Sequence, residues 1–446
     1  MQRDLLANLK AWKIAYEHSP LLVRGARQVG KSYLVKEFIK QDFSNSLIIN
    51  FEKEVQYKLA FENLDPQTIL NRLYLQSGTM LQGGTSLLFL DEIQDCPQAL
   101  ESLRYFKEEM PELHVIAAGS LLEFVINSEK ISMPVGRVET LFLMPLSFYE
   151  YLNASGLHHL RTYLGEVDLT TGVDPIVHEK LCEQLQQYFF LGGMPAVVSE
   201  YLSTKNLERV QAKQLSLMQA LRDDFGKYAS KTKHRYMQQI LKQAPGIIGE
   251  RFYYSKIDPD MGSREIKEAL GYLVDACLLH KVNHTNASGL PLNSQLKEKI
   301  FKTLFLDIGL ANSQSYLSPE ILLQKDLMLL NRGMLAEQFV GQELLAYRSP
   351  YMETQLYYWD RETRGSGAEV DYVINVDDKI IPIEVKAGKT GSLRSLQLFL
   401  NEKSCDFGVR LSLKPLNFNN RVLSIPLYMI AELPRIVRRL QGNPHS

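Results

Sequence analysis

The sequence lacks any long hydrophobic run. None of its apolar stretches approaches the roughly 18 residues of a membrane span, and the start MQRDLLANLK has no apolar signal-peptide core. The four cysteines, Cys96, Cys182, Cys277 and Cys405, are scattered without C-x-x-C spacing. This pattern excludes a cysteine zinc module and is typical of reduced thiols, so we expect a cytoplasmic protein with no membrane partner.

An excess of charge of either sign is also missing. The 50 Lys and Arg residues and 51 Asp and Glu residues give a formal net charge of −1. Nucleic-acid binding therefore has no support from overall charge and would have to rest on local surfaces. What is present is a 446-residue chain with 45% hydrophobic residues, which is typical of about three globular domains of about 150 residues each.

The clearest motif lies in Leu21–Phe38, LLVRGARQVGKSYLVKEF. Gly25, Gly30, Lys31 and Ser32 fit G-x-x-x-x-G-K-[ST], with an apolar strand before them and a helix after them. The glycines permit a loop whose N–H groups converge on phosphates, and the positive end of the helix faces the same point. In that geometry Lys31 reaches the β- and γ-phosphates, and Ser32 offers its hydroxyl to Mg²⁺. The pattern therefore predicts an ATP-binding site.

The residues expected to bind the nucleotide belong to this loop, with one more at the end of a later strand. They are Gly25, Ala26, Arg27, Gln28, Val29, Gly30, Lys31, Ser32, Tyr33 and Ser120. Ser120 follows Gly119 after an apolar run, where a small polar side chain can sense the γ-phosphate. A plain turn is the alternative interpretation of Ser120.

Two carboxylates, Asp91 and Glu92, follow the apolar run Ser86–Leu90. A strand end of this kind places Asp91 beside the phosphate loop, where it can hold the Mg²⁺ shell through water. Glu92 is then placed to polarise the attacking water as a general base. Arg137 precedes the next apolar run and suits either an arginine finger in a neighbouring subunit or a structural ion pair. An arginine finger would require a homo-oligomer.

Apolar runs of strand length alternate with helix-length segments up to about residue 160. The expected strands are Leu21–Arg24, Ser46–Phe51, Ser86–Leu90, His114–Ala118 and Val138–Leu143. Alternation of this kind predicts right-handed crossovers and a buried parallel sheet. We therefore expect an α/β fold for this part of the chain.

Several stretches of the chain resemble one family. LLVRGARQVGKS, LLFLDEIQDCP, AAGSLLEF, GRVETLFLMPLSFYEYL and YFFLGGMPAVV are similar to segments of the bacterial and archaeal AAA-type ATPases of the STAND-like branch. The C-terminal domain of those proteins is related to PD-(D/E)XK nucleases. The resemblance covers nearly the whole chain and implies an ASCE-type P-loop core, a winged-helix region and a nuclease-like end.

With this resemblance, the chain is expected to form three domains. Residues 1–205 would hold the ATPase core with a helical lid, and residues 206–320 a helical connector with a winged helix. Residues 321–446 would hold a restriction-endonuclease-like α/β domain. Within the winged helix we expect a helix at 236–244, a strand-like piece at 252–257 and a recognition-position helix at 263–279, followed by the strands LLHKV and KTLFLDIGLA. The recognition helix carries few basic residues, so packing is the alternative to DNA reading.

The third constellation combines a helix and two strands near the C-terminal end of the chain. Glu337 lies on the amphipathic helix expected at 333–347, and Asp371 lies in the strand expected at 369–375. Glu384 and Lys386 are two apart on the next strand, 379–385, so alternation puts them on one face.

The spacing of these residues is D-x12-E-x-K, which resembles the PD-(D/E)XK pattern with Val370-Asp371 in place of Pro-Asp. The resemblance implies that Glu337, Asp371 and Glu384 hold Mg²⁺, with Mn²⁺ as an alternative. It also implies that Lys386 orients the attacking water against a phosphodiester. An amphipathic edge strand with a solvated Glu and Lys is the alternative interpretation.

Together these patterns predict an ATPase whose nucleotide state controls a C-terminal metal-dependent DNase. The predicted catalytic residues are Glu92, Arg137, Glu337, Asp371, Glu384 and Lys386, and the predicted metal ligands are Ser32, Asp91, Glu337, Asp371 and Glu384. One alternative is an ATP-dependent switch or scaffold in which the nuclease fold only binds DNA or a partner. Another is a DNA-binding regulator that acts through the winged helix.

Overall fold

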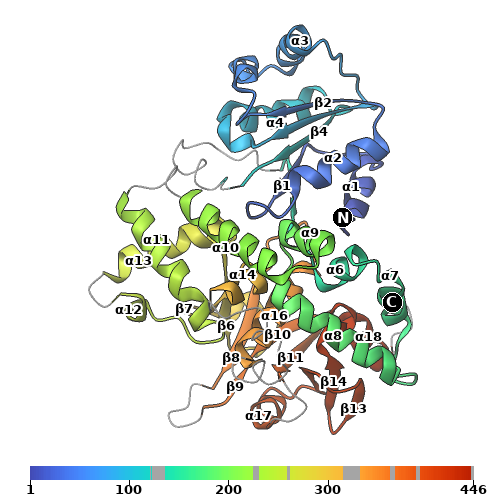
Figure 1. The fold of residues 1–446 in the computed structure, drawn as a ribbon, viewed down its shortest axis with the longest axis vertical. Helices are drawn as coiled ribbons and strands as arrows, with labels where there is room; N and C mark the ends of the chain where they lie inside the picture. Colours follow the sequence, from blue (N-terminus) through green and yellow to red (C-terminus); the bar gives the residue numbers. More distant parts are fainter. Residues whose placement is uncertain are drawn as a thin grey trace. The chain divides into compact units, whose positions relative to one another are not determined.

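The computed structural model describes residues 1–120, 122, 136–224, 231–258, 262–314, 332–361, 367–387 and 392–442 (Figure 1). The chain divides into two compact units. The first contains Met1–Met144 with the short segments Asp275–Leu278 and Ser349–Glu353, and the second contains the rest. Among the helices of these ranges, none combines the length and the apolar character that a membrane crossing needs.

The first unit is built on a five-stranded parallel sheet in the order β2-β3-β4-β1-β5. Its strands are β1 (Leu21–Arg24), β2 (Asn45–Asn50), β3 (Ser86–Asp91), β4 (His114–Ala118) and β5 (Glu139–Phe142). Every residue of β3 and β4 is buried, as expected for central strands of a parallel sheet that is covered on both faces. The predicted α/β fold and parallel sheet are confirmed, with strand ends shifted by at most one residue.

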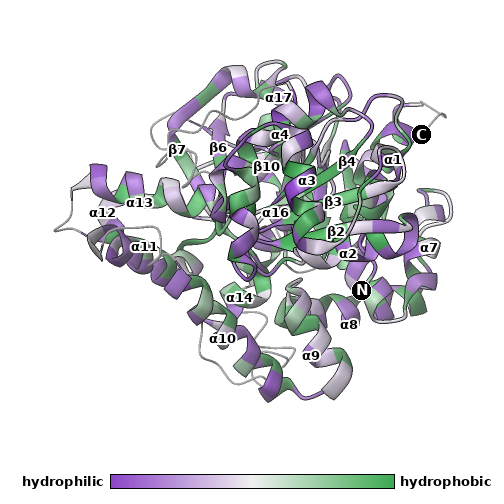
Figure 2. Cartoon of the chain, turned by 90° about the horizontal axis from the view of Figure 1, so that it is seen from above, coloured by the Kyte–Doolittle hydropathy of each residue, from purple (hydrophilic) through white to green (hydrophobic). Residues whose placement is uncertain are grey.

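A helix precedes β1, and further helices and 3₁₀ turns connect the strands. They are α1 (Leu6–Lys13), α2 (Lys31–Asp42), η1 (Val55–Phe61), α3 (Pro66–Ser77), η2 (Ile93–Asp95) and α4 (Pro97–Glu109). The start of α3 is fixed by Asp65, whose carboxylate accepts the N–H of Thr68 at 2.8 Å, with Pro66 in the first turn. In Figure 2, where each residue is coloured by hydropathy, β3 has the hydrophobic colour.

The second unit begins with a group of helices. They are α6 (Phe148–Ala154), α7 (His158–Glu166), α8 (Pro175–Leu191), α9 (Pro195–Thr204) and α10 (Leu207–Asp224). A capping box starts α6, because Ser147 and Glu150 each accept the other's backbone N–H through their side chains. Gly192 and Gly193 separate α8 from α9.

The next segment contains helices and a long hairpin. Its elements are α11 (Lys231–Gln243), η4 (Ala244–Ile247), α12 (Tyr254–Ile257), α13 (Ser263–Asp275), β6 (Leu279–Thr285), η5 (Leu292–Gln295), β7 (Leu296–Phe305) and α14 (Ile308–Ser313). Helix α11 carries the hydrophilic colour in Figure 2.

Two sequence-based assignments in this segment are wrong. Residues 254–257, which were expected to be strand-like, form the short helix α12. The predicted strand KTLFLDIGLA ends at Phe305, because the Asp307 carboxylate accepts the N–H of Leu310 and starts α14. The winged-helix assignment itself stays a prediction.

The last segment contains parallel and antiparallel strands, and it begins and ends with a helix. Its elements are α16 (Arg332–Ala346), β8 (Leu356–Asp360), β9 (Glu369–Val370), β10 (Tyr372–Val376), β11 (Lys379–Val385), α17 (Arg394–Glu402), β12 (Gly408–Ser412), β13 (Asn417–Asn419), β14 (Val422–Pro426), η7 (Leu427–Glu432) and α18 (Leu433–Leu440). The strand order β10-β11-β12-β14-β13 has β10 antiparallel to β11, and β11 parallel to β12.

The hairpin β6-β7 joins the strands of the last segment. β6 pairs in parallel with β8, and β8 pairs antiparallel with β9, which gives a sheet in the order β7-β6-β8-β9. Residues on either side of the expected boundary at 320/321 therefore share one sheet. The division into three domains stays a prediction, while in space the structure groups residues from 145 onward mainly into one unit.

Candidate nucleotide site and carboxylate cluster

The phosphate-binding loop connects β1 to α2 in a conformation that needs its glycines. Gly25 has a φ of 144°, and a Cβ there would lie 2.2 Å from the carbonyl oxygen of Leu143. Gly30 has a φ of 97° in the left-handed region and directly precedes α2. Gln28 also has a positive φ, 69°. The loop therefore depends on its glycines and holds Gln28 in an uncommon conformation, and its shape places backbone N–H groups at the N-terminus of α2.

Lys31 is buried inside this loop. Its Nζ donates to the carbonyl oxygens of Gly25 and Ala26, each at 2.9 Å. Burial lowers the pKa of Lys31 to about 8, and the nearby charge of Glu92 opposes that shift. Two neutral carbonyls are weaker partners for an ammonium group than a phosphate oxygen. The lysine is thus held in the place where an anionic phosphate would exchange with the carbonyls.

Ser32 and Asp91 meet where the motifs predicted a magnesium position. The Ser32 hydroxyl donates to Asp91 Oδ1 at 2.8 Å, and Asn50 Nδ2 donates to Asp91 Oδ2 at 3.1 Å. Asp91 is the last residue of β3 and is only 4% exposed. A hydroxyl and a carboxylate in contact at this point fit Mg²⁺, whose ligands are oxygens.

Glu92 is held in an uncommon backbone conformation. Its φ of 52° lies in the left-handed region, and Gln94 Nε2 donates to its Oε2 at 2.6 Å. Gly119 leaves room for Gln94, because a Cβ at position 119 would lie 2.8 Å from Gln94 Oε1. A non-glycine residue in this region is a strained feature of the kind that collects at functional sites.

A cavity of about 350 Å³ joins these residues. The side chains around it are Arg27, Gln28, Gly30, Lys31, Ser32, Tyr33, Glu52 and Glu92. Most belong to the predicted set, whereas Glu52 was missed. Also missed were Asn50 and Gln94, which bind Asp91 and Glu92. Asn50 ends β2 and Glu52 follows it, next to β3 in the sheet, so the rule that parallel strands end at one edge could have found them.

Two further predicted residues lie in this unit. Ser120 is buried, and its Oγ accepts a hydrogen bond from Arg27 Nε at 3.3 Å, which connects it to the loop. Arg137 forms an ion pair with Glu108, with Nε to Oε1 at 2.9 Å, and Arg104 binds the same carboxylate oxygen. The structure thus contains the ion pair that was one of the two interpretations of Arg137.

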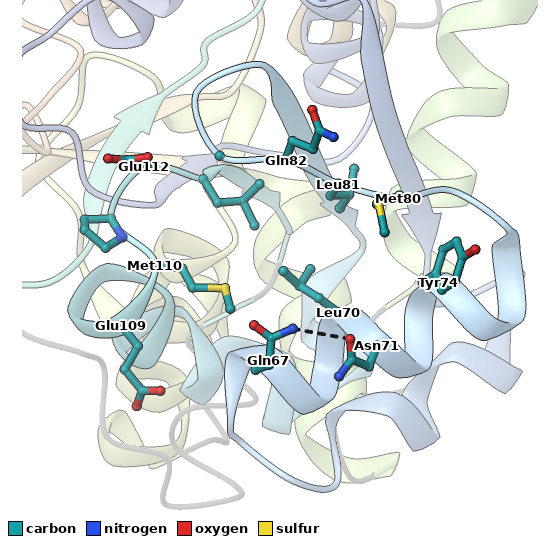
Figure 3. A pocket seen from close by; sticks show the side chains of 13 residues that line it. Gln67, Leu70, Asn71, Tyr74, Met80, Leu81, Gln82, Glu109, Met110 and Glu112 are labelled. Atoms are coloured by element: carbon teal, nitrogen blue, oxygen red, sulfur yellow. Dashed lines mark hydrogen bonds between the residues drawn. The ribbon is translucent and has the colours of Figure 1, made fainter.

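A larger cavity, of about 530 Å³, lies elsewhere in the same unit. Figure 3 shows it between α3, the segment around Met80–Gly83 and the segment that follows α4. Glu109 and Glu112 are among its lining residues, which include no Lys or Arg. Without a cation it does not suit a triphosphate, so the smaller cavity at the phosphate loop is the candidate nucleotide site.

In the second unit, the predicted carboxylates come from a helix and two paired strands. Glu337 lies on α16, Asp371 lies between β9 and β10, and Glu384 lies on β11. Asp371 Oδ2 accepts the N–H of Val385 at 2.7 Å across the β10-β11 pair. Lys386 Nζ contacts Glu384 Oε1 at 2.6 Å, so the expected same-face placement of these two residues is observed.

The cluster contains two residues that sequence reasoning missed. Lys302 on β7 donates to Glu337 Oε1 at 2.9 Å and to Glu369 Oε1 at 2.5 Å. The Lys302 side chain is 1% exposed. No local pattern marks Lys302, because it reaches the carboxylates through pairing of strands that are distant in sequence. Glu369 precedes Asp371 by two residues, and that spacing could have drawn attention to it.

Burial dominates the ionisation of this cluster. It raises the pKa of Glu337 to about 7, against the opposing charge of Lys302. Burial and the charge of Asp371 raise the pKa of Glu384 to about 7. For Lys302, burial lowers the pKa, but the charges of Glu337, Glu369 and Asp371 outweigh that effect and raise it above its ordinary value. The carboxylates therefore need cations or protons to remain together.

The cluster fits a magnesium ion in chemistry more than in spacing. Carboxylate oxygens are suitable ligands for Mg²⁺, and Glu384 Oε2 is buried with no hydrogen-bond partner. Within the described ranges, however, no three His, Cys, Asp or Glu side chains are close enough to surround a metal ion. Instead, two ammonium groups and a backbone N–H occupy oxygens of these carboxylates. A metal role for Glu337, Asp371 and Glu384 thus remains a prediction.

Helix α16 also carries a polar row beyond Glu337. Gln338 exchanges two hydrogen bonds with the backbone of Phe305, at 2.8 and 2.7 Å. Glu343 accepts the N–H of Phe148 at the start of α6, with distances of 3.1 and 3.0 Å to its two oxygens. Burial raises the pKa of Glu343 to about 8. One helix thus connects the carboxylate cluster to α6.

Comparison with family models divides the chain into three matched regions. Residues 17–152 match a model described as "AAA domain". Residues 182–320 match a "Domain of unknown function (DUF8612)", and residues 332–429 match a "Domain of unknown function (DUF4143)". The first match and the site geometry identify the N-terminal part as a P-loop ATPase domain of the AAA type. The other two descriptions name no activity, and comparison with curated proteins gave no match.

Solved structures with a similar arrangement are distant. The Walker-type ATPase PABY2304 of Pyrococcus abyssi is 14% identical, with 70% of this chain and 95% of that chain covered and a TM-score of 0.46. ORC1 of Aeropyrum pernix in complex with DNA is 11% identical, with 71% and 93% covered and a TM-score of 0.31. AMPPCP-bound DnaA from Aquifex aeolicus is 13% identical, with 61% of this chain and 86% of that chain covered and a TM-score of 0.26. Because these scores are low, we infer nothing about function from them.

Proposed function

We propose that the chain binds and hydrolyses ATP at the phosphate loop of its first unit. The observation that carries the proposal is the contact of Ser32 with Asp91 beside a cavity that Lys31 and Glu92 also line. Lys31 and Ser32 follow the carboxyl end of β1, and Asp91 and Glu92 lie at the carboxyl end of β3. Both ends belong to the same edge of a parallel sheet. Such a convergence suits phosphoryl transfer, which depends on positioning and on compensation of phosphate charge.

Each residue has a separate task in this proposal. Lys31 leaves the carbonyls of Gly25 and Ala26 and binds the β- and γ-phosphates. Glu92 orients the attacking water and takes its proton. Ser32 and Asp91 would hold Mg²⁺, which neutralises charge on the phosphates when it is bound. Ser120 would detect the γ-phosphate through Arg27, its hydrogen-bond partner.

We further propose that the nucleotide state controls a C-terminal nuclease-like domain that acts on DNA. Support comes from Asp371, Glu384 and Lys386, which meet at the β10-β11 pair with Glu337 contributed by α16. The carboxylates would hold Mg²⁺ or Mn²⁺, which supplies charge stabilisation to a phosphodiester when it is bound. Lys386 would orient the attacking water.

The chain also offers a mechanical connection for such control. The last strand of the ATPase sheet, β5, is followed after a few residues by Ser147, which caps α6. The first N–H of α6, that of Phe148, is bound by Glu343 on α16. Since α16 also carries Glu337, a shift of α6 would move a carboxylate of the cluster.

A second function, an ATP-dependent switch without nuclease activity, is favoured by one observation. Lys302 already binds two of the clustered carboxylates, so the cluster can persist without a metal ion. In that case the nuclease-like domain would bind DNA or a protein partner and would not cut. An arginine finger formed by Arg137 would require a homo-oligomer. Size measurements with a non-hydrolysable ATP analogue would detect that oligomer.

Incubation with DNA separates the two functions. Purified protein would be mixed with plasmid or single-stranded DNA and Mg²⁺ or Mn²⁺, with and without ATP. We expect cleavage that is lost in Glu384→Ala, while ATP hydrolysis persists. Glu92→Gln should lose about a hundredfold of ATP hydrolysis and keep ATP binding. Absence of divalent-dependent cutting on every substrate would leave the switch as the function.

A further inference from the structure

Lys302 reaches the carboxylate cluster from outside the segment that supplies the carboxylates. It lies on β7, opposite Val282 of β6, whereas Glu337 and Glu369 lie on α16 and β9. Its Nζ contacts both carboxylates, and its side chain is almost completely buried. A lysine buried to this degree is retained where it has charged partners.

The strand that carries Lys302 is fixed in place close to the cluster. Gln338, next to Glu337 on α16, forms two hydrogen bonds with the backbone of Phe305 on the same strand. A Cβ at Gly341 would lie 2.2 Å from a side-chain atom of Leu304, so α16 and β7 are in close contact. Lys302 cannot withdraw without a change in the packing of β7 against α16.

The same region of the chain also covers the other oxygen of Glu337. Gly249 has a φ of 77°, and a Cβ there would lie 2.5 Å from Glu337 Oε2. Lys302 therefore binds one oxygen of this carboxylate while the backbone near Gly249 approaches the other. The Glu337 carboxylate is therefore already enclosed when a cation approaches from solution.

The charges of the cluster show what Lys302 replaces. The carboxylates of Glu337, Glu369, Asp371 and Glu384 influence one another and have the ammonium groups of Lys302 and Lys386 as nearby cations. When all are ionised, negative charge exceeds positive charge. Glu384 Oε2 is buried without a hydrogen-bond partner, while Lys386 contacts the other oxygen of this carboxylate. A divalent cation at Glu337 would compete directly with Lys302.

We propose that Lys302 is a built-in cation that competes with a divalent metal ion for Glu337, so that the hairpin β6-β7 regulates metal binding by the cluster. This inference rests on the proposed nuclease-like metal site. The cluster is closed to metal while Lys302 binds Glu337 and Glu369. Movement of β7 relative to α16 opens it.

The test measures Mn²⁺ binding, by calorimetry and by electron paramagnetic resonance, in the full-length chain without nucleotide. All variants carry Asp91→Asn, which removes the metal position of the phosphate loop. We expect Lys302→Met to bind Mn²⁺ about tenfold or more tightly than the chain that keeps Lys302. Lys299→Met, an exposed lysine on the same strand, should leave the Mn²⁺ affinity unchanged.

A second variant protects the test against misfolding, since Lys302→Met leaves buried carboxylates without their cation. Lys302→Met combined with Glu369→Gln removes one charge of each sign and should also bind Mn²⁺ more tightly. Mn²⁺ should raise the melting temperature of both variants more than that of the chain with Lys302. Addition of Glu384→Ala should abolish the gain and thereby locate the metal in the cluster.

The outcomes separate this inference from the proposed function. Equal Mn²⁺ affinity with and without Lys302 would overturn the competition, even if the protein cuts DNA. A gain in Mn²⁺ affinity without cleavage of any DNA would support the competition and remove the nuclease function. A gain that survives Glu384→Ala would place the metal elsewhere and also overturn the inference.

Discussion

Lys31 and Lys302 are both buried, yet the two sites hold their ammonium groups in different ways. Lys31 rests on two backbone carbonyls, and burial lowers its pKa to about 8. Lys302 is bound by two carboxylates, whose charges outweigh burial and raise its pKa. A cation on neutral partners remains available to an anionic ligand, whereas a cation between carboxylates already has its counter-ions. The nucleotide site is thus prepared for an anion, whereas Lys302 already has its counter-ions within the protein.

The largest expected effect tests the first half of this contrast. Lys31→Ala removes the cation that would exchange carbonyls for phosphate, so ATP hydrolysis should fall by about a hundredfold or more. Initial rates of phosphate release would measure it. Lys36→Ala removes an exposed lysine of the same helix and should leave the rate unchanged. A normal rate in Lys31→Ala would show that the phosphate loop is not the hydrolytic site.

The second prediction concerns the cluster. Lys386→Ala removes the ammonium that contacts Glu384, and we expect it to abolish DNA cleavage while ATP hydrolysis stays within about twofold of the original rate. Gel assays of plasmid cleavage would measure the loss. Lys379→Ala, an exposed lysine at the other end of β11, is the matched control. Undiminished cleavage in Lys386→Ala would indicate a contaminating nuclease.

The contrast also explains how much of each site the sequence could predict. The predicted ATP site depends on residues contiguous in the chain or at the ends of parallel strands, so motifs were enough to predict its loop, Asp91 and Glu92. Asp371, Glu384 and Lys386 were predicted from strand alternation and from the resemblance to the PD-(D/E)XK pattern, and Glu337 from its place on an amphipathic helix. Lys302 was not, because its role depends on the parallel pairing of β6 with β8, which no local periodicity encodes.

The secondary structure also divides into elements that the sequence predicts well and elements that it does not. Parallel strands of the first unit follow from apolar runs between helices, and they were placed to within a residue. Residues 252–257 were expected to be strand-like as part of a winged helix, yet Tyr254–Ile257 form a helix. Tertiary packing there outweighs local preference, since Phe252 stacks against Phe301 of β7.

A smaller effect is expected from Glu343, which carries the connection from α16 to α6. Burial raises its pKa from 4.5 to about 8, so the folded chain holds more protons than the unfolded chain within that interval. Stability should therefore fall as pH rises from about 4.5 to about 8, by at most about 1.4 kcal/mol per pH unit from this group. The contribution of Glu343 to stability is therefore fully present below about pH 4.5.

Chemical denaturation at several pH values would measure this dependence. Glu343→Gln keeps an oxygen acceptor for the N–H of Phe148 and cannot ionise, so its stability should vary less with pH. Glu298→Gln changes an exposed carboxylate of β7 and serves as the control. An unchanged slope in Glu343→Gln would mean that Glu343 does not titrate in this interval.

The smallest expected effect concerns Arg137. Its ion pair with Glu108 is partly exposed, with 46% and 32% of the two side chains accessible, so Arg137→Ala should lower stability by less than about 1 kcal/mol. Arg104→Ala removes the other partner of Glu108 and should cost a similar amount. As a structural ion pair, Arg137 leaves ATP hydrolysis unchanged. A large loss of hydrolysis in Arg137→Ala alone, dependent on protein concentration, would instead mean that the arginine acts in a neighbouring subunit, because Arg104 shares the ion pair but would not share that role.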